Sequence, residues 1–180
     1  MATTCNNVQY DIKAVDEFLP KLGIPRKYWS GIIVAAKMGL IQRDRLFELV
    51  IAHNSEHLEI DSRAYLDLSD GSDVKSVVSN FACDDKRTGK WSNVFSISKV
   101  AKKVGDLRCV CYNKQLNKYH YFKIPYDAYR HITHTLHIYI ETWCGYKDEE
   151  PIPTGNTKIK KNGEFPKWWE YECTFAELCQ

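Results

Sequence analysis

The sequence predicts an α/β fold in which helices flank a mixed central β-sheet. Three observations predict it. Residues 11–54 carry apolar side chains at helical spacing. From residue 58 onward, apolar and polar residues alternate as they do in strands. A second helical spacing over 94–104 then precedes a nearly all-apolar segment at 107–112, and a helix that crosses between strands places helices on both faces of a sheet.

Three helices are expected in the N-terminal part of the chain. The first covers 11–22, and Gly23 ends it. Pro25 opens the second, which runs near 26–39, because proline favours the first turn of a helix. The third fits 43–54, where the apolar residues recur on one face.

Strands are expected in the rest of the core. They are assigned to 58–60, 64–68, 72–79, 107–112, 119–124 and 132–140. Asp70-Gly71 is a hairpin signal and predicts that 64–68 and 72–79 pair. The polar segment 80–92 is expected to be an exposed loop, and the helix over 94–104 should end at Gly105.

The chain has 180 residues, which fits one domain. We expect a core over about 43–140, N-terminal helices within 11–40 and an irregular tail over 143–180. The net charge of +2 excludes a general polycation, so any surface that binds anions needs an uneven distribution of charge. Seven cysteines, the lack of a signal peptide and the lack of a long apolar run favour a cytoplasmic protein without a membrane segment.

The most informative pattern is Asp73-Val74-Lys75. In a strand, Asp73 and Lys75 point to one face, while Val74 and Val78 point to the other. An acid and an amine beside an apolar core are costly unless they have partners or a function. Several carboxylates crowd the same turn, and converging carboxylates attract a hard divalent cation such as Mg²⁺. The competing interpretation is an exposed turn with a weak surface ion pair.

The Asp-x-Lys pattern, the acids ahead of it and the order of the elements resemble the PD-(D/E)XK nuclease superfamily, which includes many type II restriction endonucleases. The resemblance covers about residues 43–112, and it implies an αβββαβ core and Mg²⁺-dependent hydrolysis of double-stranded DNA. It also implies that Asp73 binds the metal and that Lys75 orients or deprotonates the attacking water. The chain departs from the usual pattern in two ways: no proline precedes a candidate first acid, and the second acid is Asp and not Glu.

The first acid of the family pattern has several candidates in this chain. A three-residue loop at 70–72 would place Asp67 on the face of Asp73 and Lys75, whereas a two-residue turn would place it on the other face. Asp70 would then approach the metal from the turn, and Asp61 is a more distant choice. We favour Asp67. Some members of the superfamily add a helical glutamate, for which Glu48 is the candidate.

Further residues are candidates for contacts with DNA. Lys86, Arg87, Lys90 and Trp91 follow the motif and would reach phosphates or stack on bases. Because two strands must be cut, a chain with one site would act most simply as a homodimer. One alternative is a non-catalytic DNA-binding protein that uses helices within 26–54, and another is an interaction module that uses the aromatic tail.

Overall fold

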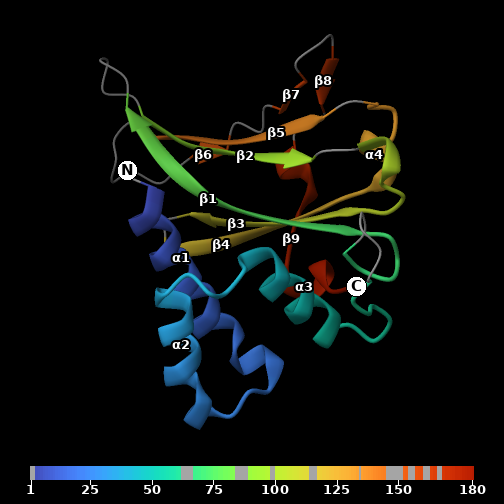
Figure 1. The fold of residues 1–180 in the computed structure, drawn as a ribbon. Coiled ribbons are helices and arrows are strands. Elements are labelled where there is room, and N and C mark those ends of the chain that lie inside the picture. Colours follow the sequence, from blue (N-terminus) through green and yellow to red (C-terminus); the bar gives the residue numbers. More distant parts are fainter. Residues whose placement is uncertain are drawn as a thin grey trace.

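The computed structural model describes residues 3–61, 67–83, 89–97, 100–113, 117–133, 135–144, 152–153, 157–159, 163–165 and 168–180. Figure 1 shows an α/β fold in which three N-terminal helices lie together on one side of a sheet. Within the described ranges, no helix has both the length and the apolar character that a membrane span requires.

Three N-terminal helices are present as predicted, but the first begins at Thr3 and not at Asp11, and its α-helical part ends at Phe18. The helices of the chain are α1 (Thr3–Phe18), α2 (Trp29–Lys37), α3 (Arg43–His53), α4 (Tyr126–Tyr129) and α5 (Phe175–Leu178). Short 3-10 segments occur at η1 (Pro20–Leu22), η2 (Arg26–Tyr28), η3 (Val100–Lys102) and η4 (Trp168–Tyr171). The turn after η1 ends at Gly23, whose left-handed φ of 66° permits the change of direction.

The main sheet has seven strands in the order β6-β5-β2-β1-β3-β4-β9. Their bounds are β1 (Asp73–Cys83), β2 (Gly89–Ile97), β3 (Leu107–Asn113), β4 (Lys118–Ile124), β5 (Leu136–Cys144), β6 (Ile152–Pro153) and β9 (Glu172–Cys173). A separate pair is formed by β7 (Thr157–Ile159) and β8 (Gly163–Phe165). Strands β1 and β3 are parallel and the other neighbours are antiparallel, so the sheet is mixed as predicted.

The sheet divides between β1 and β2. These strands pair from Asn80↔Ser92 to Cys83↔Gly89. Toward its beginning, β1 pairs instead with β3 as far as Asp73↔Leu107, while β2 continues beside β5 as far as Ile97↔Leu136. Figure 1 shows the two strands separating in this direction. We call residues 73–79 of β1 together with 93–97 of β2 the open end of the sheet.

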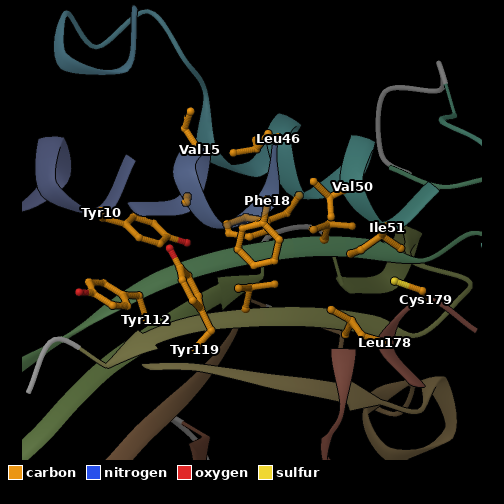
Figure 2. Packing of buried hydrophobic residues seen from close by; sticks show 14 of the residues in the cluster. Tyr10, Val15, Phe18, Leu46, Val50, Ile51, Tyr112, Tyr119, Leu178 and Cys179 are labelled. Atoms are coloured by element: carbon orange, nitrogen blue, oxygen red, sulfur yellow. The ribbon is translucent and has the colours of Figure 1, made fainter. Parts of the chain in front are cut away.

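Two apolar clusters lie on the two faces of the sheet at β1, β3 and β4. The larger one joins α1 and α3 to the strands, and Figure 2 shows Tyr10 and Phe18 meeting Tyr112 and Tyr119. Val74 belongs to this cluster. The second cluster, on the other face, is built from Leu107, Cys109, Cys111, Phe122 and Ile124 together with residues of α4 and η3. Strand β3 is therefore buried on both faces, as its nearly continuous apolar sequence predicts.

Three local expectations are wrong. Residues 94–97 belong to β2 and not to a helix, and η3 is only a short turn. The expected loop 80–92 is strand at both of its ends, because β1 reaches Cys83 and β2 begins at Gly89. The third is the hairpin: β1 pairs with β2 and β3, and in the part of 64–68 that the structure describes, Leu68 forms an isolated bridge with Ile60 instead. Pairing with strands on both sides stabilises β2 more than its weak helical periodicity stabilises a helix.

A contact between two glycines holds the turn before β1 against the segment before β3. A Cβ atom added to Gly105 would lie 2.4 Å from the carbonyl carbon of Gly71 and 2.6 Å from the nitrogen of Ser72. Gly71 itself has a φ of 86°, which disfavours other residues. The hydroxyl of Tyr129 donates to the carbonyl of Gly105 and fixes this segment from the other side.

We expect the substitution Gly105→Ala to lower the free energy of unfolding by about 1–3 kcal/mol, because backbone atoms must move to admit the methyl group. The matched control is Gly31→Ala in α2, where nothing lies within 4 Å. A helical alanine there should stabilise the protein by about 0.5–1 kcal/mol. Urea unfolding measures both changes, and equal midpoints for the two variants would contradict the close contact.

Candidate active site

Asp73 and Lys75 lie at the open end of the sheet, at the start of β1. The Nζ atom of Lys75 is 2.9 Å from Oδ2 of Asp73. Val74 and Val78 pack in the cluster on the opposite face. The predicted alternation along this strand is therefore confirmed, and the acid and the amine lie side by side.

Asp67 joins this pair from the turn that precedes β1. Its Oδ2 atom accepts a hydrogen bond of 2.6 Å from the backbone nitrogen of Val74 and lies 3.7 Å from Nζ of Lys75. Lys75 also donates to the carbonyl oxygen of Val74 at 2.9 Å. Three oxygen atoms, from two carboxylates and one backbone carbonyl, thus surround a single ammonium group.

A second ammonium group, from Lys103, binds the other oxygen of Asp73. Nζ of Lys103 is 2.6 Å from Oδ1 of Asp73, and the lysine side chain is only 8% exposed. Lys103 was not among the site residues predicted from the sequence. The nearby lysines at 99, 102 and 103 look alike in the sequence, and the tight turn of η3 decides which of them faces inward, so periodicity offers no signal.

The four side chains differ in their access to solvent. Asp73 is 2% exposed, whereas Asp67 and Lys75 are 23% and 27% exposed and form the accessible side of the cluster. Burial raises the pKa of Asp67 to about 6, and the nearby carboxylate of Asp73 adds to this increase. Burial alone would lower the pKa of Lys75, but attraction by Asp73 and Asp67 outweighs it and raises that pKa.

The arrangement of oxygen atoms fits a hard cation. Oδ2 of Asp73 is a buried oxygen without a hydrogen-bond partner in the described part of the chain, and the charge it faces is the Lys75 ammonium. Carboxylate and backbone carbonyl oxygens are the ligands that Mg²⁺ takes, and water completes its coordination. Among the described residues, no three His, Cys, Asp or Glu side chains gather at one metal position, so a cation here would depend on Asp67, Asp73 and the Val74 carbonyl.

Asp70 was a predicted metal ligand, but in the structure it pairs with a buried arginine. Its Oδ2 atom lies 2.8 Å from Nη2 of Arg108, a guanidinium that is 1% exposed, and 2.7 Å from the hydroxyl of Ser72. Arg108 also donates to the carbonyl of Leu178 near the C-terminus. Burial would raise the pKa of Asp70, but hydrogen bonds from Ser72 and Arg108 hold it below its usual value. Asp70 therefore fixes the turn.

The remaining predicted residues do not join the cluster in the described structure. Glu48 lies on α3, which packs in the cluster on the opposite face, and its Oε2 atom is 2.6 Å from Nη1 of Arg45. Lys90 and Trp91 lie on β2 where it pairs with β1, at the end away from Asp73. Lys86 and Arg87 fall outside the described residues.

No family model, curated protein or solved structure matches this chain. The resemblance to the PD-(D/E)XK nucleases therefore stays a prediction, as does the expected homodimer. The feature that bears on function is the cluster of Asp67, Asp73, Lys75 and Lys103.

We expect Asp70→Ala to lower the free energy of unfolding by about 1–3 kcal/mol, because it leaves the buried Arg108 without its carboxylate. Asp127→Ala is the control, since Asp127 and Arg130 form an exposed ion pair that contributes at most about 1 kcal/mol. Urea denaturation of both variants gives the comparison. A loss no larger than that of the control would show that the Arg108 pair does not stabilise the turn.

The raised pKa of Asp67 predicts a pH dependence of stability. Between its unfolded value of 3.8 and about 6, the folded chain binds more protons at this site than the unfolded chain, so the contribution of Asp67 to stability decreases as pH rises through this window and is constant above it. Asp67→Asn, which still accepts from Val74, should therefore gain stability relative to the wild type between pH 4 and pH 6.5.

Chemical unfolding in the presence of EDTA across this pH range measures the difference between the two proteins. Asp16→Asn, at an exposed position of α1, is the control for general charge effects. A difference between wild type and Asp67→Asn that does not change with pH would contradict a raised pKa at Asp67.

Proposed function

We propose that this protein is a Mg²⁺-dependent endonuclease that hydrolyses phosphodiester bonds of double-stranded DNA, in the manner of type II restriction endonucleases. One observation carries the proposal: two carboxylates and a backbone carbonyl converge on a single ammonium group at the accessible side of the open end. A hairpin with a simple surface ion pair would not bury Asp73 or bring a second carboxylate to it.

Asp67, Asp73 and the carbonyl of Val74 would hold the cation. When bound, Mg²⁺ would supply an acidified water and a counter-charge for the phosphate oxygens. The ammonium of Lys75 lies among these oxygens and would have to move aside for a cation to bind there. The side chain is more than a quarter exposed and has room to do so.

Lys75 then has a role that its position supports. Its ammonium remains tethered to β1 beside the carboxylates, where it can donate hydrogen bonds to the attacking water or to a phosphate oxygen. Positive charge at this place stabilises the negative charge that develops as the phosphorus is attacked. Asp73, which is buried and bonded through Oδ1 to Lys103, would keep its orientation while Lys75 moves.

The proposed substrate is double-stranded DNA. It follows from the acid and amine groups of the site and from the resemblance to the PD-(D/E)XK nucleases. A duplex requires two cuts, which a symmetric homodimer with one site in each chain would provide. The alternative of a reading head within residues 26–54 stays a prediction; of its helices, α3 buries Leu46, Phe47, Val50 and Ile51 in the core, and that face is not available for such a role. Helix α3 thus packs against the sheet and stabilises the fold.

The test is the cleavage of supercoiled plasmid with Mg²⁺, with EDTA added and with Lys75→Ala. We expect nicked or linear DNA with the wild type, none with EDTA and a rate at least about 100-fold lower for the variant, because a positioned proton donor contributes this much. Lys37→Ala, at an exposed position of α2, is the matched control and should cleave like the wild type. Plasmid that stays intact with Mg²⁺, Mn²⁺ and Co²⁺ would overturn the proposal.

A further inference from the structure

Asp73 is held by two lysines, and the proposed reaction uses only one of them. Lys75 approaches Oδ2 from the accessible side, at 2.9 Å. Lys103 approaches Oδ1 from the buried side, at 2.6 Å, and its side chain is 8% exposed. A buried lysine is costly unless an acid or hydrogen bonds compensate it, so its position beside this particular carboxylate requires an explanation.

The fold gives Lys103 little freedom. Its backbone nitrogen donates to the carbonyl of Val100 at 2.9 Å, which closes the turn of η3. Two residues later, Gly105 lies against the backbone of Gly71 and accepts a hydrogen bond from Tyr129. The backbone nitrogen of Asp73 in turn donates to the carbonyl of Asp106 at 3.0 Å. The segments that carry Lys103 and Asp73 are thus held together by backbone contacts between residues 71–73 and 105–106.

Two acids meet two amines in this cluster. Asp67 and Asp73 provide two negative charges, and Lys75 and Lys103 provide two positive ones. Lys75 is partly exposed and could make room for a bound cation, whereas Lys103 is enclosed. Its charge would oppose a cation bound beside Asp73, and its hydrogen bond holds Oδ1, so that Oδ2 is the oxygen on the side of Lys75.

We propose that Lys103 is a positioning residue of the cation site: it orients Asp73 and, by its charge, weakens the binding of a divalent cation to the free protein. This inference rests on the proposed function for its meaning in catalysis. Its effect on cation binding does not require that DNA is cleaved. Lys103 acts through Asp73 and has no assigned contact with the substrate.

The experiment compares Lys103→Met with Lys102→Met. The control removes the same charge from the neighbouring position, where the side chain is exposed. Binding of Mn²⁺ alone is measured at pH 8 by electron paramagnetic resonance, and single-turnover cleavage of plasmid is measured at saturating Mn²⁺. Circular dichroism checks folding. If Lys103→Met does not fold, Lys103→Gln replaces it, because Gln removes the charge and keeps a hydrogen-bond donor.

We expect Lys103→Met to bind Mn²⁺ several-fold more tightly than the wild type, yet to cleave about 10–100-fold more slowly, the usual cost of losing a group that orients a metal ligand. Lys103→Arg, which keeps the charge, should restore weaker binding. These opposite changes are not expected from a residue that only stabilises the fold. Mn²⁺ affinity that is unchanged, reduced or equal to that of Lys102→Met would overturn the inference. If the wild type cleaves nothing, the proposed function fails, and the Mn²⁺ measurement alone still decides the role of Lys103.

Discussion

The burial of the Asp73 carboxylate is the constraint on which the rest of the site depends. A carboxylate with 2% exposure is stable as an ion only when cations and donors surround it. Its two lysines come from different segments, β1 and the turn after η3. The start of β1 must therefore pack against the end of η3 to stabilise the charge of the Asp73 carboxylate. The same packing brings the residues of the cluster together.

Backbone packing makes this junction possible. Gly71 and Gly105 allow the two segments to approach more closely than any side chain would permit. Arg108 then fastens the turn, because it binds Asp70 and Ser72 and reaches the carbonyl of Leu178. The turn that carries Asp67 is in this way tied to the C-terminal helix α5. The arrangement separates two kinds of acid in one short segment: Asp70 stabilises the turn, and Asp67 faces the ammonium.

Periodic features of the structure were predictable from the sequence, and features set by contacts between distant segments were not. The helices α1 to α3, the buried strand β3 and the shared face of Asp73 and Lys75 follow from spacing alone. The helix expected over 94–104 was wrong because β2 has strand neighbours on both sides. Asp67 was favoured for a hairpin register, but it reaches Lys75 from a turn. Lys103 was missed because only the turn at η3 orients it.

The separation of β1 from β2 gives the cluster one of its oxygen atoms. The backbone nitrogen of Asp73 donates toward the chain before β3, so the nitrogen and carbonyl of Val74 point to the opposite side, as alternate residues of a strand do. Val74 uses these groups to bind Asp67 and Lys75. Had β2 continued beside β1 to residue 73, strand hydrogen bonds would have taken both groups, and neither Asp67 nor a cation could have used them. The division of the sheet is therefore a requirement of the site.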